Sequence, residues 1–258
     1  MNVMILQILI MEDGRVRLMH KIAVIDGMNF ALIAAAASIR NVSDKEPVEK
    51  FRDVLWAMLR SLTKKLPNDK WYVCWDSYGG KDFRSDIDSN YKAGRSMVAG
   101  LSYKDIANSQ ELFNYYNITS LEIPRSEADD AIHILCKILK EKNPQDVITI
   151  VSRDKDLIQT VQAGYANDQY DPVKKTYMEI PFYSIVKYKA LVGDPADAIP
   201  GVKGIGPKKA LKIITGAETL TPEQEEAYNK YLAMIDFNLN PRFEENIIAM
   251  KELIHLEG

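Results

Sequence analysis

Short apolar segments separated by helical patterns constrain the fold of this chain more than any other feature. The segments are Lys21–Asp26, Lys70–Trp75, Ile118–Ile123 and Val147–Val151. Continuous apolar runs of this length are typical of strands that are buried on both faces of a parallel sheet. Because the stretches between them have helical spacing, the pattern predicts an α/β fold with a mostly parallel sheet flanked by helices.

Helical patterns lie between the predicted strands and continue after the last of them. Apolar residues recur at helical spacing from Val48 to Leu66, and Ser126 is expected to cap a helix with an apolar stripe from Ala131 to Ile138. Strand patterns end at about residue 190, and the later segments look helical: Pro207–Ile214, the Pro222–Ile235 region and Pro241–Leu256. We therefore expect a sheet domain over 20–190 and a C-terminal helical subdomain over 191–258.

The N-terminus and the cysteines indicate the cellular compartment in which the protein is expected to function. Residues 1–19 are expected to form an extension in which Asp13-Gly14 favours a hairpin turn. The apolar opening Met1–Ile10 has no basic start and no small-residue cleavage site, so it predicts neither a signal peptide nor a membrane span. Cys74 and Cys136 match no disulfide framework or metal spacing, which favours a reducing, cytoplasmic environment.

Acidic residues follow or lie close to the ends of the predicted strands. The carboxyl ends of parallel strands meet at one edge of the sheet, so these carboxylates are expected to converge there. Acidic residues that close would repel one another unless hard cations such as Mg²⁺ or Mn²⁺ neutralised them. The candidate metal ligands are Asp26, Asp76, Glu127, Asp129, Asp130, Asp154, Asp156, Asp194 and Asp197.

Two such ions about 4 Å apart can promote in-line displacement at a phosphodiester, which suggests phosphoryl chemistry. A cation near the scissile phosphate would complete the site, and Lys92 is the candidate, in a glycine-rich segment that also holds Tyr91 and Arg95. Each acidic group taken alone has a simpler explanation, because Asp and Glu stabilise helix N-termini. A lysine in a loop is likewise an ordinary surface residue.

A glycine-lysine hairpin supplies a second candidate site. In Gly201–Lys209 the glycines allow a tight turn, and Pro207 suits the first position of a helix whose N-terminal amides can bind phosphate. Removing the nine clustered negative charges from the net charge of −3 leaves +6 on the rest of the chain, which favours a polyanionic partner. The candidate DNA contacts are Arg84, Lys92, Arg95, Gly201, Lys203, Gly204, Gly206, Lys208 and Lys209.

Six short motifs follow one another over about residues 20–215. They are V-I-D-G at Val24–Gly27, the strand ending in Asp76, Y-K-A-G-R at Tyr91–Arg95, E-A-D-D-A at Glu127–Ala131, S-R-D-K-D-L at Ser152–Leu157 and G-D-P-A-D-A-I-P-G-V-K-G-I-G at Gly193–Gly206. In this order they resemble the 5′ nuclease or flap endonuclease family, which includes the 5′ nuclease domain of bacterial DNA polymerase I and stand-alone bacteriophage enzymes.

The resemblance implies a PIN-like core over 20–190, a helical arch at about residues 77–105, and a helix-three-turn-helix element that holds duplex DNA and often a K⁺ ion. By this likeness Asp76, Glu127 and Asp129 would bind the first metal ion, with Asp26 between the ions. Asp130, Asp154, Asp156, Asp194 and Asp197 would be shared with or belong to the second ion. Lys92 and Arg95 would contact the scissile phosphate, and Tyr91 would stack on the terminal base.

The implied activity is two-metal hydrolysis of DNA at a 5′ flap or end, as flap endonuclease and 5′→3′ exonuclease, with RNA–DNA hybrids as a further substrate. The implied role is primer removal in replication by a monomer. Two other classes stay open. A PIN-type ribonuclease would lack the pair Asp194 and Asp197 and the hairpin, and a non-catalytic protein that binds DNA junctions would not need the full acidic set.

Overall fold

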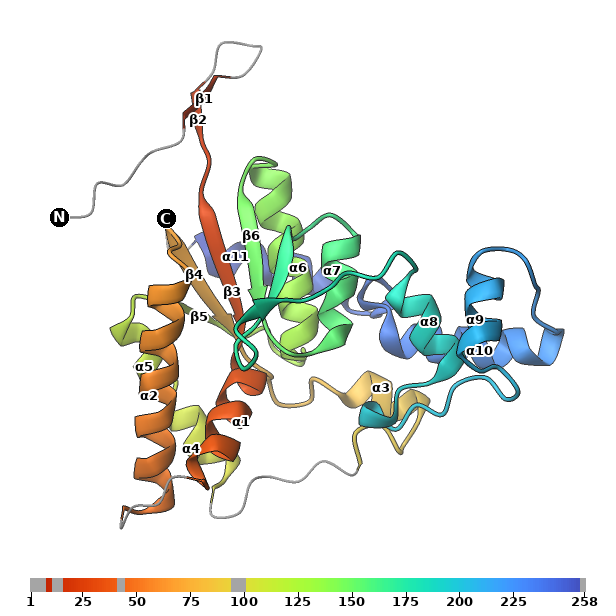
Figure 1. The fold of residues 1–258 in the computed structure, drawn as a ribbon, viewed down its shortest axis with the longest axis horizontal. Coiled ribbons are helices and arrows are strands. Elements are labelled where there is room, and N and C mark those ends of the chain that lie inside the picture. Colours follow the sequence, from red (N-terminus) through yellow and green to blue (C-terminus); the bar gives the residue numbers. More distant parts are fainter. Residues whose placement is uncertain (1–7, 11–15, 41–44, 94–100, 256–258) are drawn as a thin grey trace.

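A mixed six-stranded sheet forms the centre of the computed structural model, which describes residues 8–10, 16–40, 45–93 and 101–255 (Figure 1). The strand order is β5-β4-β3-β6-β7-β8, and all neighbours are parallel except β7 and β8. The strands are β3 (Lys21–Asp26), β4 (Lys70–Cys74), β5 (Thr119–Leu121), β6 (Val147–Val151), β7 (Asp168–Asp171) and β8 (Thr176–Tyr177). The four strands predicted from apolar runs, β3 to β6, are confirmed.

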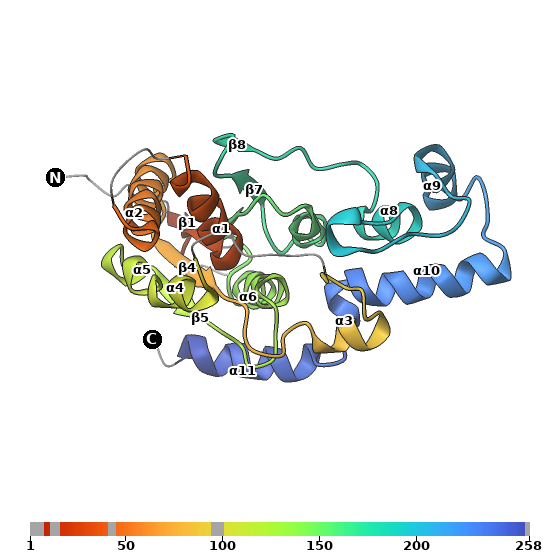
Figure 2. The same ribbon diagram turned by 90° about the horizontal axis from the view of Figure 1, so that it is seen from below.

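Helices cover both faces of the sheet. Alternate side chains of β3 point to opposite layers: Ile22 and Val24 pack under α6 (Ala128–Lys142) and α11 (Phe243–His255). Ala23 and Ile25 pack in the other layer, whose main helices are α1 (Gly27–Ser38) and α2 (Pro47–Lys65). Figure 2 shows α1 beside α2, and α11 alongside α6. This double coverage explains why the strands are apolar on both sides.

Helix α6 begins differently from the sequence-based expectation. Ser126 was expected to cap it, but the N-cap residue is Glu127, and Ser126 Oγ donates to the carbonyl of Glu127. The amide of Ala128 instead donates to Asp76 Oδ1 at 2.7 Å. A carboxylate from the end of β4 therefore stabilises the start of α6, and this contact draws the acidic residues of two elements together.

The chain after β8 is helical, as predicted. Its helices are α8 (Ile185–Val192), α9 (Pro207–Ile214), α10 (Pro222–Ile235) and α11, and the part of the chain that the structure describes has no strand after Tyr177. Helix α8 packs against both α9 and α10, while α11 returns to α6 on the sheet. No helix within the described ranges is long and apolar enough to cross a membrane.

Two expected features fall partly outside the described residues. The segment expected to form an arch contains α3 (Asp82–Ile87) and reaches α4 (Tyr103–Asn108), but residues 94–100 lie outside the description. At the N-terminus, β1 (Ile8–Ile10) and β2 (Val16–Leu18) pair antiparallel, as a hairpin requires. The expected turn at Asp13-Gly14 is also outside the described residues. The short helices α5 (Glu111–Tyr115) and α7 (Ile158–Gln162) complete the helical layers.

Candidate active site

A first acidic group lies at the carboxyl ends of β3, β4 and β6. Asp26 Oδ1 accepts from the amide of Asn29 at 2.9 Å, and Asp26 Oδ2 accepts from Ser152 Oγ at 2.8 Å. Ser152 Oγ in turn accepts from the amide of Asp154 at 3.0 Å. Ser152 therefore links the ends of two neighbouring strands. The group consists of Asp26, Asp76, Asp129 and Asp154.

Burial and repulsion among these carboxylates raise the pKa values of two members of the group. Burial raises the pKa of Asp26 to about 7, and the negative charges of Asp154 and Asp76 add to the rise. Burial also raises the pKa of Asp129 well above its usual range, again with help from Asp154 and Asp26. Carboxylates that disfavour one another's charge form a set of hard oxygen ligands that a divalent cation would stabilise.

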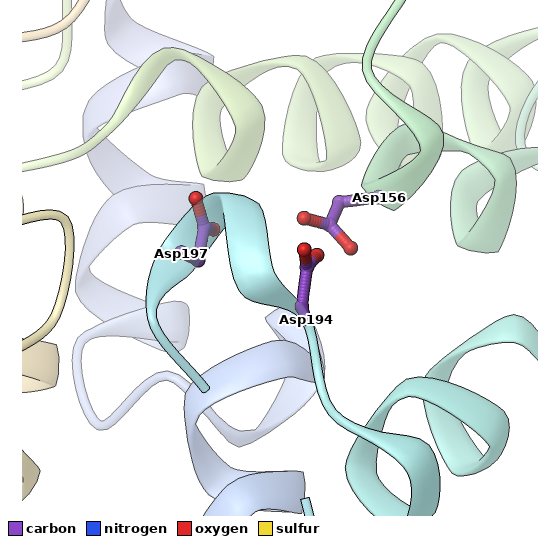
Figure 3. Close-up of side chains that lie close together, drawn as sticks. All are labelled: Asp156, Asp194 and Asp197. Atoms are coloured by element: carbon purple, nitrogen blue, oxygen red, sulfur yellow. The ribbon is translucent and has the colours of Figure 1, made fainter. Parts of the chain in front are cut away.

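A second acidic group lies beside the first. Asp156 belongs to the short 3₁₀ helix Lys155–Leu157, while Asp194 caps and Asp197 ends another, Pro195–Asp197. Ligand oxygens of these three carboxylates all lie within 4.8 Å of one another, and Figure 3 shows Asp156 and Asp194 pointing toward each other. The group is thus compact enough to hold one ion.

Lys189, from α8, pairs with the second group. Its Nζ donates to Asp156 Oδ1 at 2.5 Å and to Asp194 Oδ2 at 2.7 Å. Burial raises the pKa of Asp156 to about 7 although Lys189 opposes the rise, and the charge of Asp154 adds to it. Asp154 therefore acts electrostatically on both groups. Asp129, Asp156 and Asp197 also line one small cavity, so the two groups form one continuous acidic site.

Lys92 lies near members of both groups, since the charges of Asp197 and Asp129 act on it. Its Nζ donates to Glu127 Oε1 at 2.6 Å, and its backbone amide donates to the carbonyl of Asp197 at 3.3 Å. Burial alone would raise the pKa of Glu127, but the charges of Lys92 and Arg84 outweigh it and lower this pKa to about 2. Glu127 is consequently an anion held by cationic side chains.

Arg84 does not lie where a DNA contact would. Its side chain is 2% exposed, and it donates to Asp130 through Nη1 and Nη2 at 2.8 and 2.9 Å. Its other bonds go to Glu127 Oε2 at 2.6 Å and to the carbonyl of Met234 at 2.8 Å. The expectation that Arg84 binds DNA is therefore wrong. Asp130, which is also buried, is the counter-charge of Arg84, so the structure does not support its expected metal role.

Tyr91 also differs from the expectation. Its side chain is 5% exposed and packs in a cluster with Ile158 and Ile185, and its hydroxyl donates to Glu127 Oε2 at 3.1 Å. A ring buried in this way has no accessible face for stacking on a terminal base, so Tyr91 instead orients Glu127. The expected partner of Lys92, Arg95, lies outside the described residues.

The glycine-lysine hairpin joins α8 to α9. Val202 and Ile205 are buried against α8 and α9, which leaves Lys203, Gly204, Gly206 and Lys208 exposed and Lys209 half-buried. Gly201 has a φ of 75°, and a Cβ at this position would lie 2.4 Å from the amide nitrogen of Gly193. Only glycine allows the hairpin to approach the end of α8 so closely.

Two residues of the site were missed by reasoning from the sequence. Lys189 lies in the last turn of α8, which ends at the C-cap Gly193, and Asp194 follows directly. A predicted helix over these residues was the signal that could have placed Lys189 beside Asp194. Ser152 directly follows β6 and precedes Asp154 by two residues. Neither residue carries a carboxylate, which is why a search for carboxylates passed over both.

Comparison with known proteins agrees with this architecture. The family model described as "5'-3' exonuclease, N-terminal resolvase-like domain" matches residues 21–183, and the model described as "5'-3' exonuclease, C-terminal SAM fold" matches residues 180–257. The chain belongs to the 5′-3′ exonuclease family. A 5′-3′ exonuclease of Bacillus subtilis is 30% identical over 223 residues, which cover 78% of this chain and 72% of the relative.

DNA polymerase I of Lactococcus lactis is 29% identical over 254 residues, 92% of this chain, yet the chain spans only 28% of the length of that polymerase. Among solved structures, T5 5′-exonuclease with bound zinc has a TM-score of 0.68 at 18% identity, and the match covers 92% of this chain and 100% of that one. T5 D15 flap endonuclease with DNA and metal ions has a TM-score of 0.64 at 17% identity, with 91% and 99% covered. These structural matches show that the fold is shared.

Proposed function

We propose that this protein is a divalent-metal-dependent nuclease that hydrolyses phosphodiester bonds of DNA near a 5′ end or at the base of a 5′ flap. The observation that carries the proposal is the continuous acidic site, in which two groups of carboxylates meet close to Lys92, whose side chain is 11% exposed. Membership of the 5′-3′ exonuclease family supports it, as does the shared fold with a T5 flap endonuclease that was solved with DNA and metal ions.

The donor set fits hard divalent ions. Every candidate ligand is a carboxylate oxygen, which Mg²⁺ and Mn²⁺ prefer over softer ligands. Asp26, Asp76, Asp129 and Asp154 would hold one ion, and Asp156, Asp194 and Asp197 the other. A direct contact of Glu127 with the first ion stays a prediction. Ions bound there would supply Lewis-acid stabilisation of the negative charge that develops on a phosphodiester during displacement. A K⁺ ion at the hairpin stays a prediction.

The residues of the chain itself would orient the substrate. An incoming phosphate would compete with Glu127 for the ammonium group of Lys92, which would then stabilise the charge on the reacting phosphate. The exposed amides and lysines of the hairpin would hold the duplex through its backbone, without reading its sequence. Cleavage would leave a 5′ phosphate and a 3′ hydroxyl. Flap preference, action on RNA–DNA hybrids, primer removal, the monomeric state and a cytoplasmic location stay predictions.

Cleavage of a 5′-flap duplex labelled at either end tests the proposal. In Mg²⁺ the protein should release the flap by cutting near the junction, and EDTA should abolish cutting. The two labels identify the strand and the position of the cut. Tight, junction-dependent binding without any cutting in Mg²⁺ or Mn²⁺ would contradict the proposal and assign the protein to the class that only binds DNA junctions. Cutting confined to RNA would instead indicate a PIN-type ribonuclease.

A further inference from the structure

Lys189 lies between two carboxylates of the second acidic group. Its ammonium group donates to Asp156 Oδ1 and to Asp194 Oδ2, at 2.5 and 2.7 Å, and its side chain is only 12% exposed. Oxygens that approach one ammonium this closely are also near enough to each other to share a single divalent ion. The ammonium group therefore stands where an ion bridging Asp156 and Asp194 would have to bind.

We propose that Lys189 is a resident counter-cation of the second acidic group, and that a divalent ion can bind Asp156 and Asp194 only by displacing its ammonium group. The inference rests on the proposed function in one respect, that the second group binds a metal ion. It adds that the occupancy of this group is set by competition with a side chain of the protein.

The physical basis is exclusion and charge. An ammonium group and a divalent ion cannot share the same oxygens, and their positive charges repel each other strongly at contact distance. Lysine suits such a role because its charge is compact and its four-carbon stem is flexible, so the head group can withdraw without moving the helix. Arginine would hold two carboxylates in a rigid fork and would be harder to displace.

In the first acidic group, the hydrogen-bond donors to Asp26 are neutral, unlike the ammonium group of Lys189 in the second group. The two oxygens of Asp26 accept from the amide of Asn29 and from the hydroxyl of Ser152, which are neutral donors. Neutral donors orient a carboxylate without competing for its charge. The two groups are consequently expected to differ in affinity, with the Lys189 group filling at the higher concentration of divalent ion.

Calorimetric titration of the metal-free protein with Mn²⁺ tests the inference without relying on activity. The wild type should show a tighter and a weaker class of site. Lys189→Met should tighten the weaker class by at least about tenfold, because a competing unit charge at contact distance is removed. Lys189→Arg should bind no more tightly than the wild type. The matched control is Lys187→Met, since Lys187 is exposed on the same helix.

Thermal denaturation completes the test. In EDTA, Lys189→Met should melt at a lower temperature than the wild type because Asp156 and Asp194 lose their counter-charge, and Mn²⁺ should restore the loss. A weaker class that is unchanged or weaker in Lys189→Met overturns the inference and leaves the proposed function intact. Tighter binding in Lys189→Arg also overturns it, even if Lys189→Met fails to fold. A wild type that binds no Mn²⁺ overturns both the inference and the proposed function.

Discussion

Lys92 is the residue whose place in the site carries the most specific chemical expectation. Its Nζ lies 2.6 Å from Glu127 Oε1, and the charges of Asp197 and Asp129 also act on it. We expect Lys92→Ala to slow single-turnover cleavage by about 100-fold or more, because a charge aimed at the reacting phosphate is lost. DNA binding should change much less. Weaker binding with an unchanged single-turnover rate would show that Lys92 acts in binding only.

The acidic residues predict how the stability of the metal-free protein depends on pH. Burial, helped by neighbouring carboxylates, raises the pKa of Asp26 and of Asp156 to about 7, above the usual value of 3.8. A raised carboxyl pKa contributes stability that is fully present below pH 3.8 and is lost as pH rises through about 7. The lowered pKa of Glu127 has the opposite sign, but it acts only below its usual value of 4.5.

The melting temperature in EDTA should therefore fall as pH rises from about 5 to about 8, because the raised pKa values make the unfolded chain lose its protons first. Bound Mg²⁺ should reverse this fall, so the stabilisation by Mg²⁺ should grow over the same range. The measurement is a series of thermal scans at matched ionic strength with Na⁺ as the control. Stabilisation by Mg²⁺ that is independent of pH would contradict the assignment.

At the residue scale, the sequence identified most of the site and misjudged its buried members. Asp26, Asp154 and Asp156 could be placed because the end of a strand fixes where they lie. Arg84 and Tyr91 could not, since their burial depends on packing against α10 and the cluster around Ile158. A basic residue in a glycine-rich segment looks the same in a sequence whether it faces solvent or a buried carboxylate.

At the scale of elements, Arg84 joins three helices. It belongs to α3, pairs with Asp130 of α6 and donates to the carbonyl of Met234 in α10. We expect Arg84→Met to lower the free energy of unfolding by about 3–5 kcal/mol, because buried carboxylates lose their partner. Denaturant titration measures the loss. Arg125→Met is the control, since Arg125 is 64% exposed and its ion pair with Asp82 is 3.7 Å long. Equal effects of both substitutions would refute this role.

Elements with a local apolar pattern could be predicted from the sequence, whereas elements that depend on distant contacts could not. Strands β3 to β6 are apolar runs, and they were found. Strand β7, with the sequence D-Q-Y-D, is polar in composition and was missed, because its pairing with β6 is what makes it a strand. The contact between Asp76 and the start of α6 joins residues 52 positions apart, so no local pattern could reveal it.

At the scale of the whole molecule, the acidic site draws on both parts of the fold, because Asp156 follows β6 whereas Asp194 and Asp197 lie between α8 and the hairpin. We place the boundary between sheet domain and helical region before α8, since the boundary expected at residue 190 would cut this helix. With this boundary, α8 belongs wholly to the helical region together with the hairpin. The hairpin therefore lies only a few residues from Asp194 and Asp197 of the acidic site.

Charge on α9 should therefore govern DNA affinity. We expect the double substitution Lys208→Ala and Lys209→Ala to weaken binding at every sequence and to reduce the salt slope by about 2, because two phosphate contacts are lost. The control is the matching double substitution Lys64→Ala and Lys65→Ala. These lysines lie in the last turn of α2, at the opposite end of the molecule from α9 (Figure 1). Fluorescence anisotropy over a range of salt concentrations measures both. An unchanged slope would mean that the duplex binds elsewhere.

The central claim is that the converging carboxylates perform the cleavage. Its most direct test is the single-turnover rate on a 5′-flap duplex in Mg²⁺ for Asp154→Asn, because Asp154 acts on both acidic groups. We predict a loss of about 1,000-fold or more, no loss for the exposed control Asp86→Asn, and flap binding retained by both. Cleavage by Asp154→Asn at close to the wild-type rate would contradict the account.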